Sequence, residues 1–373
     1  MRGVFGGGQP VSVIRTALVA ILGFSVLIVA RPAAADLGFN IFGDTNYTLS
    51  RDARPGTATL TNNSFSTPRL ELFGNATQGK LAFLTETMFE IGDGNEFFVD
   101  VERVEVGYLF SDAFRLRAGR FHTAIGYYND AFHHGRYFQA TVDRPTMVRF
   151  EDEGGLIPAH SVGLHADGRF VLGVTGSLRY DTDIANGRGL TAGEVTNLVD
   201  HDNDKLFNVR LRFEPTFLDG LIVGANVLES GITAATDPMN LPTSPTVFIR
   251  EWILGAHVVY LERNVHAIAE YLWVSHKTAG QGGATQSAFL ELGYEFGRVL
   301  PYVRGEWIRF PGAIDAFYAT NALYLARGSS KTGILGAKVT ASDFVAFKLE
   351  GEFVHRDAGG SIASIAAQCA FAF

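Results

Sequence analysis

Charged side chains that alternate with apolar ones are the residues of this sequence most able to do chemistry. Along residues 207–214 the even positions are polar or charged and the odd positions are apolar, and the same division recurs along 290–296 and 347–353. Successive side chains of a β-strand point to opposite faces, so each segment would carry one charged and one apolar face. Charges gathered along a water-filled passage attract, orient and select ions and polar solutes. This is the chemistry of permeation, not of bond breaking.

Motifs for catalysis or metal binding are weak by comparison. The sequence contains no Gly-x-Ser-x-Gly nucleophile motif, and its spacing defines no trio of Ser, His and carboxylate. His133 and His134 with Glu151 could bind a metal, but adjacent side chains on a strand point apart and the spacing matches no zinc motif. A hydrogen-bonding role is favoured for them. We therefore expect no enzyme activity, no catalytic residue, no cofactor and no metal.

The alternation must be positioned by strands, and it recurs from residue 37 to the end of the chain. Sixteen strands are expected, at about 37–47, 68–77, 80–91, 97–110, 114–121, 160–166, 169–180, 205–214, 221–229, 248–261, 265–277, 287–296, 299–310, 331–340, 344–355 and 362–373. A soluble sandwich or a propeller would also have short strands, but no repeat of propeller length is found. An even strand number, with 42 Gly and 30 Phe, favours an all-β, transmembrane antiparallel β-barrel.

Both ends of the chain agree with a barrel that is exported. Arg2 and Arg15 flank a positive leader, an apolar run follows at 16–30, and small residues at 33–35 form a cleavage site. We therefore expect a signal peptide at 1–35 and a barrel at 36–373; the run is too short to favour a membrane-spanning helix. The last strand ends in Phe373 and resembles the terminal strand of bacterial outer-membrane barrels. That resemblance implies recognition by the barrel assembly machinery.

The connections between strands alternate in length. Short links such as Gln78-Gly79 and Asp167-Gly168 are expected on the periplasmic side, and long loops on the outer side. The segment 122–159 carries many apolar and aromatic residues, among them Ile125, Tyr128 and Phe150, which is unusual for an exposed loop. We expect it to fold into the barrel and narrow the water channel that about sixteen strands would leave.

Several motifs resemble a known family. They are Gly119-Arg-Phe-His122, Gly126-Tyr-Tyr-Asn129, His133-His-Gly135, Arg144-Pro145 and Phe150-Glu-Asp-Glu-Gly-Gly155. This pattern resembles the outer-membrane porin superfamily, in particular the phosphate-selective porin O/P-like group. The resemblance implies a passive channel, commonly a homotrimer, with a constricting inward loop. The chain departs from the phosphate-selective members because no ladder of lumenal Arg and Lys is evident.

Alternation also predicts which charges face the lumen. The expected pore-lining residues are Arg69, Glu86, Glu90, Asp100, Glu102, Arg115, Arg117, Arg179, Arg210, Arg212, Glu270, Arg304 and Glu306. The expected constriction-loop residues are Arg136, Arg144, Arg149, Glu151, Asp152 and Glu153, which could either line the pore or only pin the loop to the wall.

Over all the positions that alternation assigns to the lumen, acids outnumber cations, because these positions also include Glu71, Glu105, Glu214, Glu251, Glu291, Glu295, Glu350 and Glu352. We therefore expect a channel for small polar solutes and ions with weak, slightly cation-favouring selectivity. A substrate-selective channel of the anion or phosphate type is the alternative, and a barrel enzyme or an adhesin is less favoured. Outer-membrane lipid and a homotrimer are the expected partners, with small residues of the last strand, such as Ala363 and Ala367, as one candidate contact. The net charge of -8 argues against a nucleic-acid partner.

Overall fold

The computed structural model describes residues 35–92, 95–132, 135–151, 153–190, 204–233, 248–280, 282–311, 315, 317–318 and 328–373. Residues 1–34, and with them nearly all of the predicted signal peptide, lie outside this range. Among the described residues, no helix has the length and apolar character needed to cross a membrane.

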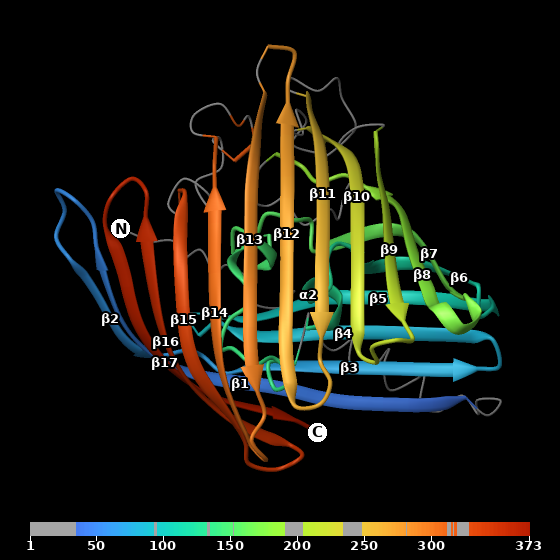
Figure 1. The fold of residues 1–373 in the computed structure, drawn as a ribbon, viewed down its shortest axis with the longest axis horizontal. Helices are drawn as coiled ribbons and strands as arrows, with labels where there is room; N and C mark the ends of the chain where they lie inside the picture. Colours follow the sequence, from blue (N-terminus) through green and yellow to red (C-terminus); the bar gives the residue numbers. More distant parts are fainter. Residues whose placement is uncertain are drawn as a thin grey trace, which may run out of the picture.

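Seventeen strands form one continuous antiparallel sheet (Figure 1). They are β1 (Asp36–Ala53), β2 (Leu60–Phe65), β3 (Arg69–Gln78), β4 (Leu81–Ile91), β5 (Phe97–Ser111), β6 (Phe114–His122), β7 (His160–Val171), β8 (Gly176–Asn186), β9 (Lys205–Pro215), β10 (Leu221–Thr233), β11 (Phe248–Tyr260), β12 (Val265–Lys277), β13 (Gly282–Tyr294), β14 (Val299–Arg309), β15 (Ser330–Thr340), β16 (Val345–Arg356) and β17 (Ser361–Ala372).

The sheet closes because β1 pairs with β17 on one side and with β2 and β3 on the other. β2 pairs with residues 47–52 of β1, and β3 pairs with residues 36–44, so β2 and β3 are successive parts of one barrel strand. The result is a closed barrel of 16 strands, which confirms the predicted fold. Closure pairs each barrel strand with a neighbour on both sides along at least part of its length, as a lipid environment requires for backbone N–H and C=O groups.

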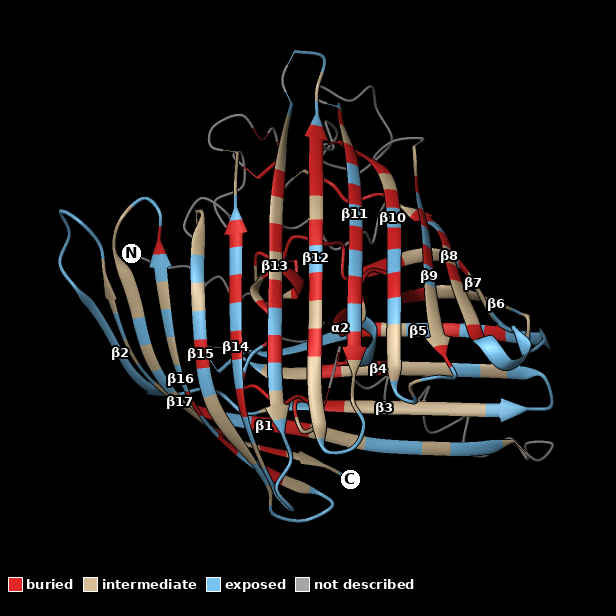
Figure 2. Ribbon diagram, viewed as in Figure 1, coloured by how far each residue is buried: buried red, intermediate tan, exposed pale blue. Residues whose placement is uncertain are grey.

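Burial alternates along the strands as the sequence predicts. In β14 and β16 the exposed side chains are mainly apolar or small, whereas the charged Arg304, Glu306, Lys348 and Glu350 are buried inside (Figure 2). Large apolar residues are exposed around most of the barrel, for example Leu254 on β11. An apolar exterior and a polar interior invert the usual soluble arrangement, as a barrel in lipid requires.

One predicted turn is wrong. Asp167-Gly168 lies inside β7, which continues to Val171, and the chain reverses at the short 3-10 helix Gly173–Thr175. Gly173 has a φ of 61°, the left-handed conformation that such a turn needs. Asp167 is kept in the strand by its two-point contact with Arg115, and Gly168 pairs with Tyr180. Several strands are also longer than predicted, so the outer loops that they join are shorter. For example, β1 continues to Ala53, β2 follows at Leu60–Phe65, and β8 continues to Asn186.

The segment between β6 and β7 folds into the barrel, as the sequence predicts. It contains the single-turn helix α2 (Tyr128–Ala131) and a 3-10 turn at Thr146–Val148, and Figure 1 shows α2 enclosed by the strands. Ile125, Tyr128 and Val148 are almost completely buried. This segment, residues 123–159, is called the inward loop below.

Candidate functional site

Carboxylates on the barrel wall hold the backbone of the inward loop. Glu270 on β12 accepts hydrogen bonds from the backbone N–H groups of Tyr127 (3.0 Å) and Tyr128 (2.6 Å). Glu306 on β14 accepts one from Thr146 at 2.8 Å. Further wall acceptors of loop N–H groups are Glu71 on β3, Asp183 on β8 and Glu350 on β16. The anchors therefore come from strands all around the barrel.

Cations on the wall hold the carbonyl groups of the same loop. Arg210 donates to the carbonyl oxygen of Gly126 at 2.8 Å, and Arg304 donates to that of Asp143 at 2.9 Å. Lys348 donates to the carbonyl oxygen of Thr141 at 2.8 Å. Charged groups make stronger hydrogen bonds than neutral ones, so this ring of side chains fixes the loop in place. Four residues predicted to line the pore have their nearest contacts with the loop or with each other: Arg210, Glu270, Arg304 and Glu306.

One half of the lumen is apolar and filled. Loop residues pack against inward-facing side chains of β10, β11 and β12, namely Leu228, Ile232, Ile249, Ile253, Ile268, Leu272 and Val274. These positions were missed in the sequence analysis, although a signal exists: around Ile253, the residues Trp252 and Leu254 are apolar too, so both faces of the strand are apolar. No water path is expected through this packed half.

The opposite wall is polar. A narrow cavity of about 100 Å3 lies between the inward loop and strands β3 to β7. It is lined by Arg69, Met88, Glu90, Asp100, Glu102, Arg120, Phe150, Glu151, Glu153 and His160. Six of these residues were predicted as site residues, and the structure brings them together. Met88 on β4, Arg120 on β6, His160 on β7 and Phe150 in the inward loop were missed, because their proximity depends on how the loop lies against these strands, which spacing does not reveal.

Hydrogen bonds and ion pairs fix the side chains around this cavity, which is called the eyelet below. The Nε2 atom of the His160 ring lies 2.7 Å from a carboxylate oxygen of Glu102 on β5. The backbone N–H of His160 donates a hydrogen bond to Glu151 of the loop at 3.0 Å. Burial raises the pKa of Glu151, but the hydrogen bonds from His160 outweigh this effect and leave the pKa lower than usual. Glu151 therefore carries a negative charge and serves as a strut between the loop and β7.

The cationic residues of the inward loop differ in their surroundings. The Arg136 guanidinium lies 2.6 Å from Asp143 and 3.6 Å from Asp44 of β1. Arg144 donates to the carbonyl oxygen of Val148 at 2.7 Å, and burial lowers its pKa to about 10, which leaves it charged at neutral pH. Its guanidinium also stacks 4.7 Å from the centre of the Phe150 ring.

The remaining predicted residues fall into three groups. Glu86 pairs with Arg103, which the sequence analysis missed, at 2.6 Å. Glu153 lines the eyelet, and Arg149 is a neighbouring charge in the same loop. Asp152, together with His133 and His134, lies outside the described residues. Within the described part of the chain, no group of three or more His, Cys, Asp or Glu residues has the arrangement of a metal site.

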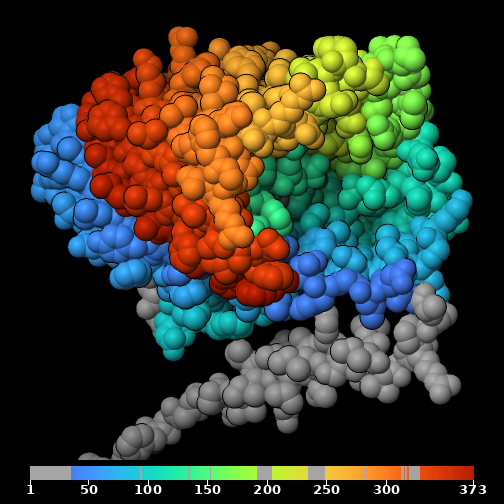
Figure 3. Space-filling model, turned by 60° about the horizontal axis from the view of Figure 1, so that its bottom comes forward, coloured from blue at the N-terminus to red at the C-terminus, as the bar shows by residue number. Residues whose placement is uncertain are grey.

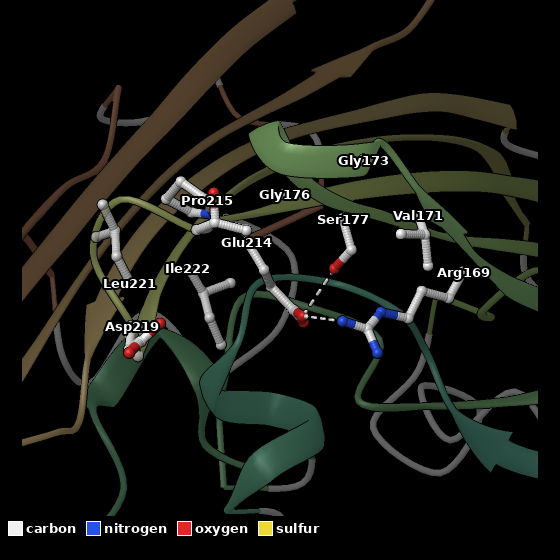
Figure 4. Close-up of a pocket in the computed structure, with 12 residues that line it drawn as sticks. Arg169, Val171, Gly173, Gly176, Ser177, Glu214, Pro215, Asp219, Leu221 and Ile222 are labelled. Carbon is white, nitrogen blue, oxygen red and sulfur yellow. Dashed lines mark hydrogen bonds and ion pairs between the residues drawn. The ribbon is translucent and has the colours of Figure 1, made fainter.

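A second charged wall extends over β6 to β9, with one acidic partner, Glu105, on β5. Its ion pairs are Arg115–Asp167, Arg117–Glu105, Arg179–Glu214, Arg210–Asp181 and Arg212–Asp181, at 2.6 to 3.1 Å. Figure 4 shows a neighbouring pocket of about 360 Å3 at the end of these strands, where Ser177 and Arg169 point toward Glu214. Arg115, Arg169 and Arg179 keep 42 to 48% of their side-chain surface exposed, more than their acidic partners.

The architecture defines a closed outer-membrane-type β-barrel with a loop folded into its lumen. Three solved structures have similar folds. OmpT, an outer membrane protein of Vibrio cholerae described in its trimer form, matches with a TM-score of 0.52 and 9% identity, over 91% of this chain and 100% of that chain. The outer membrane channel DcaP of Acinetobacter baumannii has a TM-score of 0.56, 12% identity and coverage of 91% and 98%, and OprB of Pseudomonas putida has a TM-score of 0.56, 9% identity and coverage of 91% and 94%. No family model and no curated protein matches the sequence. At these identities the likeness is one of fold.

Proposed function

We propose that this protein is a porin of the bacterial outer membrane, a channel for passive diffusion of small polar solutes and ions. The observation that carries the proposal is the division of the lumen into a packed apolar half and a charged half. The inward loop fills the apolar half of the lumen. Solutes would therefore pass through the charged half, along the eyelet and the charged wall of β6 to β9. Figure 3 is consistent with such a route, because it shows a hollow between the orange strands near β13 and the teal strands near β5.

The fold comparisons support the placement and, more weakly, the assembly. DcaP is described as an outer membrane channel, and one OmpT structure is a trimer form. A homotrimer in outer-membrane lipid is therefore part of the proposal. The aromatic end of β17 supports assembly by the barrel machinery: Phe373 is 60% exposed and its ring lies 5.3 Å from that of Phe344.

The eyelet sets the selectivity in this proposal. Two acids of the eyelet, Glu102 and Glu151, contact His160 and are not counted toward its net charge. The other acids, Glu90, Asp100 and Glu153, outnumber the cations Arg69 and Arg120. A narrow passage with excess negative charge favours cations over anions of equal size. The selectivity is weak, because opposite charges lie on the same cavity.

An anion-selective channel is the second candidate, favoured by a specific observation. Arg115, Arg169 and Arg179 are the most exposed charges on the wall of β6 to β8. If the narrowest section for a moving ion lies beside them, the sign of selectivity reverses. This candidate retains the channel and changes only its substrate class.

Planar-bilayer recordings of purified protein test the proposal. Under a salt gradient, the reversal potential should indicate a weak preference for cations, and Glu90→Gln with Asp100→Asn should shift it toward anions. Arg115→Gln with Arg179→Gln is the matched pair on the other wall and should produce a smaller shift. A protein that inserts but conducts no ions contradicts the channel, and a strong anion preference abolished by the second pair favours the alternative. Hydrolase assays on the same sample address the enzyme class.

A further inference from the structure

The outward face of β14, β15 and β16 has a hollow where other strands carry large side chains. Gly305 and Gly333 lie directly opposite each other, and Gly351 on β16 lies opposite Leu335. All three are exposed. A Cβ atom added at Gly305 or Gly333 would meet nothing within 4 Å, and neither residue has a positive φ. Barrel packing therefore does not require glycine at these two positions.

The hollow is an apolar groove of about 490 Å3, called the glycine groove below. Val303, Leu335 and Phe353 form its sides. The groove lies on the face that the proposed function places in lipid, so an occupant reaches it from within the bilayer. An elongated hydrocarbon chain fits such a shape, and its burial against the sides is favourable in proportion to the apolar area covered.

Two cations, Arg309 and Lys331, and the imidazole of His355 lie at one end of the glycine groove. Lys331 is opposite both Trp307 on β14 and His355 on β16, one row of outward positions beyond Gly333, which is about 7 Å along the strand. Arg309 ends β14 on the same side. All three are exposed, and within the described part of the chain none of them forms an ion pair. Tryptophan beside cations marks the membrane–water interface.

These strand ends lead into the connections at 310–329 and 357–360, which we place on the outer side of the membrane. The lipid that meets them is therefore one of the outer leaflet. Two cations and a histidine beside an apolar groove complement a molecule with hydrocarbon chains and a phosphate. A second copy of this chain would have to place an acid against these cations to offset the cost of burying them.

We propose that the outward face of β14 to β16 binds a phosphorylated lipid of the outer leaflet. One acyl chain occupies the glycine groove, and a phosphate lies among Arg309, Lys331 and His355. The proposal rests on the proposed function for its membrane placement, but it is independent of conduction. Lipid binding and conductance are measured separately, so failure of one does not conceal failure of the other.

Native mass spectrometry and equilibrium binding in neutral detergent test the site, with diphosphoryl lipid A as the probe. Phosphate-free lipid A and phosphatidylglycerol are the comparison lipids. Removing charge in Arg309→Gln with Lys331→Gln should weaken lipid A binding roughly fivefold for each charge lost. Filling the groove in Gly305→Leu with Gly333→Leu should weaken it at least as much. Both variants should conduct like the unmodified protein, which also shows that they fold.

Matched controls lie on the outward face of other strands. Lys277→Gln on β12 and Ala256→Leu on β11 change the same chemistry away from the glycine groove and should leave lipid A binding unchanged. Equal retention of phosphate-free lipid A overturns the proposed phosphate contact, and equal binding of phosphatidylglycerol overturns the assignment to an outer-leaflet lipid. The proposal is also overturned if the groove-filling pair changes the oligomeric state and leaves lipid binding intact, because the groove is then a contact between copies.

Discussion

Replacing Glu270 with alanine should release one side of the inward loop while the barrel stays folded. Glu270 is 3% exposed and accepts two hydrogen bonds from the backbone of α2, at 3.0 and 2.6 Å. Alanine offers no acceptor, so both N–H groups would lie in a buried space without their partner. The sixteen-strand sheet does not depend on these bonds, and the other wall anchors of the loop remain.

The expected magnitude follows from the nature of the bonds. A buried N–H group that loses its acceptor costs about 1 to 3 kcal/mol, so leaving two of them unsatisfied should lower the free energy of local opening by about 3 kcal/mol. Because 1.4 kcal/mol corresponds to a factor of ten, the open state of the loop should become about a hundredfold more populated. Single channels should then show more frequent conductance steps, because the loop moves within the water path.

Two measurements check this result, hydrogen exchange of the amides at 125–130 and single-channel noise. Glu229→Ala is the control, because Glu229 faces outward on β10 and pairs with Arg250 instead of the loop. Gly126→Ala provides an independent route to the same state: Gly126 has a φ of 64°, and a Cβ there would lie 2.1 Å from a Glu270 oxygen. If Glu270→Ala exchanges and gates like the unmodified protein, the wall carboxylates do not hold the loop.

Three further predictions concern folding and pH. Deleting Phe373 removes its ring contact with Phe344 and the hydrogen bond from its backbone N–H to the carbonyl oxygen of Ile41 at 2.8 Å. The yield of folded barrel, measured by heat-modifiable migration on gels, should therefore fall, and an unchanged yield would contradict the role of Phe373. Gly119→Ala should destabilise the barrel, because Gly119 has a φ of 138° and a Cβ would lie 1.9 Å from the Val104 carbonyl oxygen, whereas Gly333→Ala should melt normally. Burial raises the pKa of the Asp143 carboxyl, but Arg136 and Arg149 hold that pKa well below its usual range. Because the folded-state pKa is depressed, the pair stabilises the loop fully above about pH 4 and loses this effect only as pH falls through the folded value. The difference in loop exchange between Asp143→Asn and the unmodified protein should therefore stay constant from pH 5 to 8; a difference that disappears at pH 6 would refute the assignment.

The strands could be predicted from the sequence because their chemistry is local. Alternation of Phe207, Val209 and Leu211 with polar neighbours is a direct consequence of a wall between lipid and water. Asp167-Gly168 failed as a turn because its partners are distant in sequence. The contact between Asp167 and Arg115 spans 52 residues, and no local pattern distinguishes a glycine in a turn from one paired across a sheet.

The sequence predicted many of the residues that belong to the site but not how they are arranged in space. Glu90 and Asp100 were predicted to be lumenal from alternation, and Glu153 was predicted as a residue of the constriction loop; the structure places all three around one cavity. His160 and Arg120 were missed because their roles depend on how the inward loop crosses the lumen. The apolar half was missed because alternation assigns a direction to each side chain but does not say what fills the space in front of it.

The charge that a solute meets is therefore different from the charge that the wall carries. Glu251 lies 2.9 Å from His276, and Glu291 lies 2.7 Å from His266 and 3.3 Å from Arg304, all on strands where acids dominate the sequence. With Glu270, Glu306 and Glu350 bound to the inward loop, most acids of β11 to β16 already have buried partners. A buried, paired charge contributes little to the potential in the passage, because the opposite charge beside it cancels its field at a distance. In the proposed channel, selectivity then depends on the charges that keep some exposure, such as Glu90 and Asp100 of the eyelet and the Arg residues at the ends of β6 to β8. Substituting a buried acid should change how the loop moves, and substituting an exposed one should change which ions pass.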